Sequence, residues 1–289
     1  MIKIGIESTA YITDKNYTEG IKKMKEHGYD CMDFRDFMCP DSEFYSMYQK
    51  QFVEYFSEFK KAADCIGVNV WQMHSMWPQD DTTEKSRALV VEKSKLAIKA
   101  AGILGCKYFI IHPVLPYGWG DEPTIEEAHK LTVERINELL PFAKKEGVVI
   151  CLENMPLGKG HSFSTVQEIK DVMSAVNDPN VKVCYDTGHC NVVGENQYKS
   201  IKLLGDDLAT LHVHDDINRQ DRHIIPYLGE INWEEIIEAL AEIGFDGCIS
   251  LETSVSHQMP EPMKGQMQRV VADIARFIAL KIEKRKSND

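Results

Sequence analysis

Short apolar runs alternate with longer amphipathic segments along the whole chain. Eight runs have the length and the Val, Ile and Leu content of buried strands: residues 2–7, 30–34, 68–74, 108–112, 148–153, 181–186, 208–214 and 248–252. Between them, helix-like patterns cover residues 17–27, 42–66, 84–104, 125–145, 166–176, a short stretch near Lys199, 233–243 and 262–284. A helix after each strand predicts a parallel sheet with right-handed crossovers. Eight such units close most simply into a (β/α)8 barrel, the TIM barrel.

The boundaries between these segments contain the expected helix-capping residues. Gly105, Gly147 and Gly244 each follow a helical run and precede a strand, as helix C-cap glycines do. Thr124 and Glu127 form a capping-box pattern that opens a helix. No interior linker, low-complexity segment or long repeat interrupts the 289 residues, and a barrel needs roughly 250. We therefore expect one domain, over residues 1–289.

Composition narrows the classes of partner and compartment. The formal net charge of −12 argues against a broad nucleic-acid face, because an acidic surface repels a polyanion. The eight cysteines contain no CxxC pair, and several lie in apolar runs such as VVICLEN and VKVCYDT, which is typical of free thiols in a reducing compartment. No run resembles a signal peptide or approaches ~18 apolar residues. The sequence thus predicts a cytoplasmic protein without a membrane span.

Residues that can bind metals stand at the ends of six predicted strands. They are His74, His112, Glu153, Asp186 with His189 just after it, His212 with His214, and Glu252. Six of the ten histidines, counting His223, lie at these ends or in the loops beyond them. In a barrel, the carboxyl ends of all strands surround one axis on one face, where active sites lie.

Taken singly, each of these residues has an ordinary explanation. An acid at a strand end is often a helix N-cap, and a lone histidine is more often a hydrogen-bonded core residue than a ligand. Together, carboxylates and imidazoles on one rim would repel one another or remain unpaired without a cation. A set of three carboxylates and one imidazole suits Mn²⁺, Mg²⁺ or Co²⁺ with open positions, whereas more histidines favour Zn²⁺. We expect one divalent metal ion, Mn²⁺ first among them.

Short motifs in a consistent order make the chain resemble a known superfamily. It is similar to the xylose isomerase-like TIM barrels, which include sugar phosphate isomerase/epimerase proteins, ketose 3-epimerases, inosose dehydratases and the endonuclease IV family. The matching pieces are MHS at 73–75, IHP at 111–113, LEN at 152–154, YDTGH at 185–189, LHVHD at 211–215, DRH at 221–223, GEINW at 229–233 and LET at 251–253. The ordered set is specific for the superfamily but not for one activity.

The resemblance implies roles for individual residues. In the ketose epimerases four residues hold one metal, and the matching positions here are Glu153, Asp186, His212 and Glu252. The two glutamates also form the acid/base pair of that family. The positions assigned to substrate binding are His74, His112, His189 and Arg219, although Arg219 lies one residue away from the family's usual spacing. His214, Asp221 and His223 are assigned to the support of the site or to an additional metal.

An endonuclease IV-like zinc phosphodiesterase acting on abasic DNA is the main alternative. All nine ligand types of that three-zinc family occur here at matching places: His74, His112, Glu153, Asp186, His189, His212, Asp221, His223 and Glu252. However, the loops SMWPQDDTTE and PVLPYGWGDE after His74 and His112 are acidic, and a protein that holds DNA needs cationic donors to its phosphates.

The favoured hypothesis is a divalent-metal-dependent isomerase or epimerase of a small sugar or polyol. Glu153 and Glu252 would transfer a proton next to the carbonyl through a metal-stabilised enediolate. Trp77, Tyr117 and Trp119 could stack on a sugar or simply pack their loops. No phosphate cradle is evident, which favours an unphosphorylated substrate, with no nucleic-acid or membrane partner; a homo-oligomer is compatible with the sequence. Two other hypotheses remain open. One is a metal-dependent dehydratase or lyase of a keto-polyol. The other is a barrel that binds metal without turnover or serves as a subunit of a larger lyase.

Overall fold

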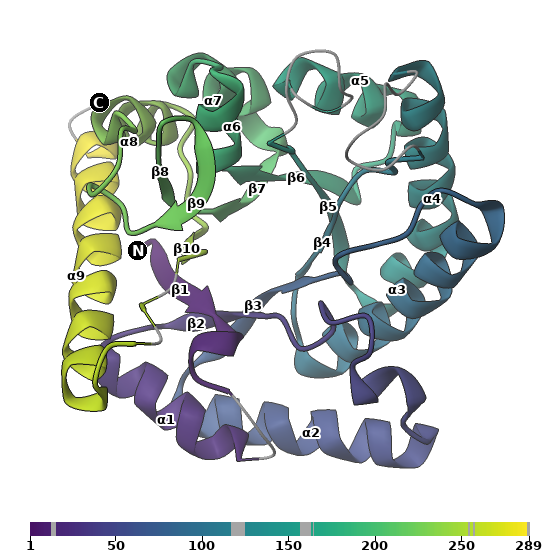
Figure 1. Cartoon of the computed structure of the whole chain (residues 1–289), viewed down its shortest axis with the longest axis horizontal. Helices are drawn as coiled ribbons and strands as arrows, with labels where there is room; N and C mark the ends of the chain where they lie inside the picture. Colours follow the sequence, from purple (N-terminus) through teal and green to yellow (C-terminus); the bar gives the residue numbers. More distant parts are fainter. Residues whose placement is uncertain are drawn as a thin grey trace.

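Eight parallel strands form the central sheet of the computed structural model (Figure 1), which describes residues 1–12, 16–116, 125–156, 163, 165–253, 255–256 and 258–287. In hydrogen-bonded order the strands are β10 (Cys248–Leu251), β1 (Lys3–Glu7), β2 (Cys31–Phe34), β3 (Asn69–His74), β4 (Tyr108–Ile111), β5 (Val149–Glu153), β6 (Val181–Asp186) and β7 (Leu208–His212). The ends of this order meet just beyond β7, where Val213 bridges Leu251 in parallel. The amide of Val213 donates to the carbonyl of Ser250 at 2.9 Å, and the amide of Glu252 donates to Val213 at 3.1 Å. These bonds close the ring, and the predicted (β/α)8 fold is confirmed.

Helices surround the strands on the outside of the ring (Figure 1). They are α1 (Tyr17–His27), α2 (Gln49–Ile66), α3 (Glu84–Leu104), α4 (Ile125–Glu146), α5 (Val166–Val176), α6 (Thr187–Val193), α7 (Gln197–Leu204), α8 (Trp233–Glu242) and α9 (Glu261–Lys286), with 3₁₀ turns at Ser8–Ala10, Glu43–Ser46 and Gly205–Asp207. Among the described residues, no helix is both long and apolar enough to cross a membrane.

Most predicted boundaries agree with the structure to within a few residues, but three features differ. The helix expected over 42–66 is divided into a 3₁₀ turn and α2. The short helix α6 was not predicted, because seven residues are too few to show a helical period. The antiparallel hairpin of β8 (Asp215–Ile217) and β9 (Gln220–Ile224) was also missed, since three to five polar residues give little alternation to detect.

The capping residues explain several of the correct boundaries. Gly105, Gly147 and Gly244 have φ angles of 68°, 72° and 71°, a left-handed conformation that costs glycine little. Among the described residues, two capping boxes form, at Thr83 before α3 and at Thr165 before α5. The box expected at Thr124 lies outside the described residues.

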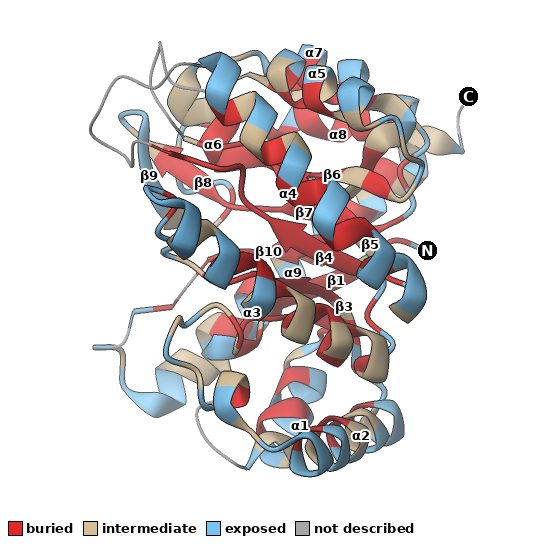
Figure 2. Ribbon diagram, turned by 90° about the vertical axis from the view of Figure 1, so that its right-hand side faces the viewer, coloured by how far each residue is buried: buried red, intermediate tan, exposed pale blue. Residues whose placement is uncertain are grey.

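Alternation along the strands separates two apolar layers. One face of the sheet packs against the helices, and the buried strands and inner helix faces contrast with exposed outer helix faces in Figure 2. The other face fills the lower barrel with a smaller cluster of Tyr108, Ile110, Cys151 and Cys184. All eight cysteines are free, and six of them are buried. At the carboxyl ends of the strands the inward residues become polar, and the candidate site begins there.

Candidate metal centre

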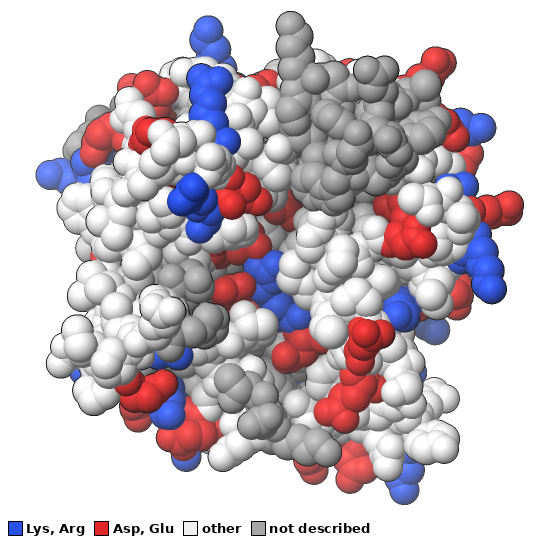
Figure 3. All heavy atoms as spheres, in the orientation of Figure 1, with Lys and Arg blue, Asp and Glu red and all other residues white. Residues whose placement is uncertain are grey.

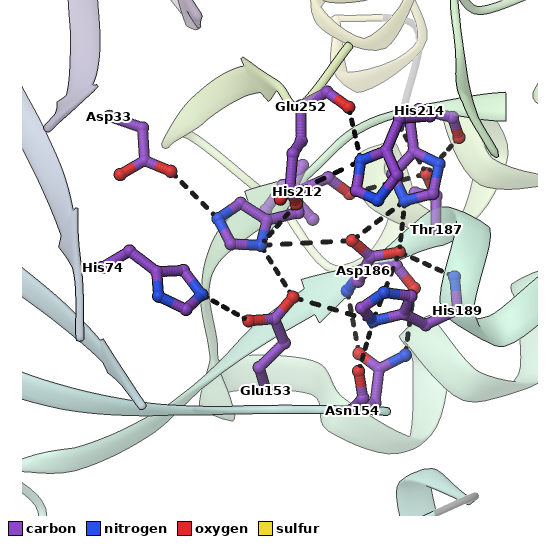
Figure 4. A network of polar contacts seen from close by, with 12 residues as sticks. Asp33, His74, Glu153, Asn154, Asp186, Thr187, His189, His212, His214 and Glu252 are labelled. Carbon is purple, nitrogen blue, oxygen red and sulfur yellow. Dashed lines mark hydrogen bonds and ion pairs between the residues drawn. The ribbon is translucent and has the colours of Figure 1, made fainter. Parts of the chain in front are cut away.

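The four residues expected to hold a metal converge at the carboxyl end of the barrel (Figure 4). Glu153, Asp186 and His212 are the last residues of β5, β6 and β7, and Glu252 directly follows β10. Nδ1 of His212 lies 2.8 Å from Oε1 of Glu153, 3.0 Å from Oε2 of Glu252 and 4.0 Å from Oδ2 of Asp186. One ligand atom from each of the four lies within 4.8 Å of all the others, and all four residues are buried. This is the spacing that a single cation between them requires.

Glu153 occupies the centre of a wider group of imidazoles. Its Oε2 lies 3.1 Å from Nε2 of His112 and 3.3 Å from Nε2 of His74, and its Oε1 lies 3.7 Å from Nδ1 of His189. The structure therefore brings three of the four residues assigned to substrate binding against the central carboxylate.

Arg219, the fourth, lies elsewhere. It is exposed at the turn between β8 and β9, and its guanidinium approaches the backbone at Gly194. It does not line the cavity at the metal centre. The structure thus gives no support for contact between Arg219 and a substrate held there.

A second group of possible ligands adjoins the first. His189, His214, Asp221 and His223 also offer atoms within 4.8 Å of one another. Asp221 lies 3.5 Å from Nε2 of His189 and 3.2 Å from Nε2 of His223. His214 links the two groups, because its Nε2 lies 3.0 Å from Oδ1 of Asp186.

Two backbone features fit this second group into the fold. The ring of His214 packs on Gly188 of α6 so closely that a Cβ at Gly188 would lie 1.9 Å from it, so this position requires glycine. His223 stacks on His214 with ring centroids 4.1 Å apart and has a φ of 49°. Such left-handed strain in a non-glycine residue is concentrated at functional sites.

The site stabilises charge of both signs. Burial alone would raise the pKa of Glu153, but the charge of His212 and hydrogen bonding to His112 lower it well below its usual range. For Glu252, burial is likewise outweighed by Arg35 and His212, which lower its pKa. Burial alone would lower the pKa of His189, but Asp186 and Asp221 raise it to about 9. The carboxylates thus attract positive charge strongly, whether it is carried by imidazolium groups or by a metal ion.

The ring nitrogens are arranged as metal-ligating histidines require. Nδ1 of His74 lies 2.7 Å from the carbonyl of Ser75, and Nδ1 of His189 lies 2.7 Å from the carbonyl of Asn154. A carbonyl can only accept, so these nitrogens carry protons and leave the opposite nitrogens free to coordinate. The first group itself offers three carboxylates and one imidazole, a donor set that fits a divalent cation.

A cavity of about 180 Å³ opens beside the centre. Its described lining consists of Arg35, Met38, His74, Trp77, His112, Glu153, Met155, Pro156, His189, Asp221, His223 and Glu252. Trp77 meets His112 edge to face with centroids 4.4 Å apart. Tyr117 and Trp119, also considered for sugar stacking, lie outside the described residues.

Sequence reasoning missed three polar residues of the site. Arg35 donates to Glu252 and, at 3.0 Å, to Glu7, and Asp33 lies 3.0 Å from Nε2 of His212. The signal was present in CMDFRDF, where positions 31, 33 and 35 alternate onto one face of a strand. Glu7 ends the first strand and was overlooked there, and polar residues inside the second strand and just after it were not considered.

Sequence relatives of this chain include sugar isomerases and a nuclease. It is 23% identical over 263 residues to inosose isomerase of Bacillus velezensis, covering 87% of this chain and 88% of that protein. It is 36% identical over 124 residues to D-psicose 3-epimerase of Ruminiclostridium cellulolyticum, but this match spans only 43% of this chain and 41% of the epimerase. A probable endonuclease 4 of Acholeplasma laidlawii is 28% identical over 200 residues, covering 64% and 66%.

Solved structures share the fold over nearly the full length. D-psicose 3-epimerase with D-tagatose, from Clostridium cellulolyticum H10, superposes with a TM-score of 0.79 at 22% identity, covering 96% of this chain and 99% of that one. An IOLI protein with a bound zinc atom gives a TM-score of 0.76 at 20% identity, covering 98% and 99%. The family model of the xylose isomerase-like TIM barrel matches residues 21–274, and the chain therefore belongs to that family.

Proposed function

We propose that this chain is a divalent-metal-dependent isomerase or epimerase of a small sugar or polyol. The observation that carries the proposal is the convergence of Glu153 and Glu252, from opposite edges of the site, on Nδ1 of His212 beside a small cavity. The full-length similarity to inosose isomerase and the partial similarity to D-psicose 3-epimerase support the same class of reaction.

The two glutamates are the proposed acid/base pair. Their low pKa values keep both as carboxylates, the form that accepts a proton from carbon. One glutamate removes the proton next to the substrate carbonyl. For an epimer, the other carboxylate takes up a proton from solvent and delivers it to the opposite face of the same carbon, while the first glutamate releases its proton to solvent. For an isomer, the first glutamate returns the abstracted proton to the neighbouring carbon.

Glu153, Asp186, His212 and Glu252 are the proposed ligands of one metal ion, with Mn²⁺ first because three of the four donors are carboxylates. When bound, the cation supplies Lewis-acid stabilisation for negative charge that develops on the substrate oxygens. His74, His112 and His189 line the cavity and can hydrogen-bond with substrate hydroxyl groups.

The cavity favours a small, uncharged substrate. Its volume of about 180 Å³ is below the ~300 Å³ at which pockets for drug-sized ligands begin. Arg35 is the one Lys or Arg in the described lining, and it already pairs with Glu7 and Glu252. An unphosphorylated ketose fits this environment better than a sugar phosphate does.

The test is a panel of ketoses and keto-polyols, each with and without phosphate, incubated with Mn²⁺-loaded protein in deuterated water. We expect an epimer or isomer that carries deuterium at the carbon next to the carbonyl. Release of water with formation of an unsaturated or dicarbonyl product would show that the enzyme is a dehydratase. Absence of any product across the panel would favour a barrel without turnover.

The second cluster of ligands supports one rival function, a zinc phosphodiesterase acting on abasic DNA. His189, His214, Asp221 and His223 would add a further metal site next to the first. The charge on the surface points the other way: in Figure 3 acidic and basic groups are interspersed over the described part of the face shown, without a continuous basic track. A metal count separates the two, because the isomerase requires near one Mn²⁺ or Mg²⁺ per chain and the nuclease near three Zn²⁺.

A further inference from the structure

A layer of buried polar residues lies inside the barrel below the metal centre. Asp33 of β2, Gln72 of β3 and Thr210 of β7 are each at most 1% exposed. Inward positions of a barrel at this depth are ordinarily apolar, because an unpaired polar group costs free energy when it leaves water. A polar layer that is kept there needs a reason.

The layer connects opposite walls of the barrel through hydrogen bonds. Thr210 donates to Oε1 of Gln72, and Nε2 of Gln72 donates to Oδ2 of Asp33 at 3.3 Å and to the carbonyl of Leu211 at 3.3 Å. The same Oδ2 lies 3.0 Å from Nε2 of His212. Around the closed ring, β10 and β1 lie between β7 and β2, so Asp33 reaches His212 across the barrel (Figure 4).

Asp33 is a buried acid without a complete set of partners. Its Oδ1 has no hydrogen-bond partner among the described residues, and Arg35 donates to Glu7 and Glu252 instead. A buried carboxylate with one oxygen left unpaired is costly. Positive charge on the far side of the His212 ring would compensate it, and that side faces Glu153 and Glu252 at 2.8 and 3.0 Å.

We propose that Asp33 is a positioning residue for the metal centre. It accepts the Nε2 proton of His212, which fixes the tautomer and turns Nδ1 toward the carboxylates, and its negative charge makes that nitrogen a stronger donor. Gln72 and Thr210 hold Asp33 in this orientation. Carboxylates behind ligating histidines commonly act in this way, and losing one typically weakens metal binding roughly 10–100-fold. The inference rests on one part of the proposed function, namely that His212 is a ligand of the metal ion.

The test measures metal affinity rather than turnover. Wild type, Asp33→Asn and Asp33→Ala are stripped of metal, and Mn²⁺ is titrated against a competing fluorescent chelator. We expect Asp33→Ala to raise the dissociation constant roughly 100-fold and Asp33→Asn roughly 10-fold, the limits of the usual range, because an asparagine oxygen still accepts the Nε2 proton. Thr210→Val leaves Asp33 in place and only loosens its support, so we expect a smaller loss.

Asp81→Asn is the matched control, because Asp81 is also buried and pairs with Arg135 away from the centre. It should lower the melting temperature of metal-free protein without changing metal affinity. In the Co²⁺-loaded proteins, the visible absorption should change for Asp33→Ala and not for Asp81→Asn.

The outcomes separate this inference from the proposed function. Wild-type affinity in Asp33→Ala and Asp33→Asn overturns the positioning role and leaves the isomerase proposal standing. If the Asp33 variants melt at a lower temperature but bind Mn²⁺ as tightly as wild type, Asp33 serves only the stability of the fold. That result also overturns the inference. Failure of wild type to bind any divalent cation overturns both.

Discussion

Replacing Glu153 or Glu252 by glutamine tests the proposed acid/base pair most directly. Glutamine preserves the shape of the side chain but removes its charge and most of its proton affinity. For Glu153 the change occurs beside four imidazole rings at 2.8–3.7 Å. For Glu252 it removes the buried partner of Arg35.

The expected loss of activity follows from the role in proton transfer. A positioned acid or base typically contributes roughly 10²–10⁴-fold, so each variant should lose at least two orders of magnitude in kcat even at saturating Mn²⁺. Recovery of activity with added metal would show that the glutamate is only a ligand. The control is Glu195→Gln, which changes a half-buried carboxylate that accepts from the amide of Val166, outside the cavity lining.

The fold should survive at some cost. Removing one member of a buried ion pair costs roughly 3–5 kcal/mol. At roughly 2 cal/mol/K per residue, the 289 residues have an unfolding entropy of about 0.6 kcal/mol/K. The melting temperature of each metal-free variant should therefore fall by about 5–8 °C, measured by calorimetry. Near-normal kcat in either variant would remove that glutamate from the mechanism.

Three further outcomes are expected. Chelation should lower the melting temperature and abolish activity together. A ligand at a free concentration ~100 times its dissociation constant stabilises the folded protein by ~2.7 kcal/mol. An unchanged melting curve after exhaustive chelation argues against a tightly held metal. Asp36→Asn should stabilise the protein at pH 7 but not at pH 3.5. Burial raises the pKa of Asp36 from 3.8 to about 6, so the folded protein holds this proton to a higher pH than the unfolded chain does. Wild type therefore loses up to about 3 kcal/mol of its free energy of unfolding as the pH rises from 3.8 to about 6. Equal stability differences at both pH values would contradict it. Zinc-loaded protein should neither incise an abasic-site oligonucleotide nor bind duplex DNA in a salt-sensitive way, and efficient incision 5′ to the lesion would install the nuclease instead.

Local patterns were sufficient for the architecture. The eight apolar runs and the helices between them were visible because buried parallel strands are apolar throughout and amphipathic helices repeat every 3.6 residues. A barrel places every strand end on one face, so sequence position alone brought Glu153, Asp186, His212 and Glu252 to the same rim. The helix α6 and the hairpin β8–β9 were not predicted, because short polar elements are held by tertiary contacts, such as the hydroxyl of Thr187 donating to the carbonyl of His214 at 2.8 Å.

The sequence by itself determined the fold, the face on which the candidate site lies and the residue types that gather there. Only the tertiary structure decided which side chains share that face at contact distance. It brought Asp33 from β2 to His212 on β7 and Arg35 to Glu252 across 217 positions of sequence, and it left Arg219 exposed at a turn. The reason is physical: strand periodicity fixes which way a residue points, but contact across the barrel depends on strand register. Register shifts such as those at Met32/Asp33 and Val183/Cys184 leave no signal in the local pattern.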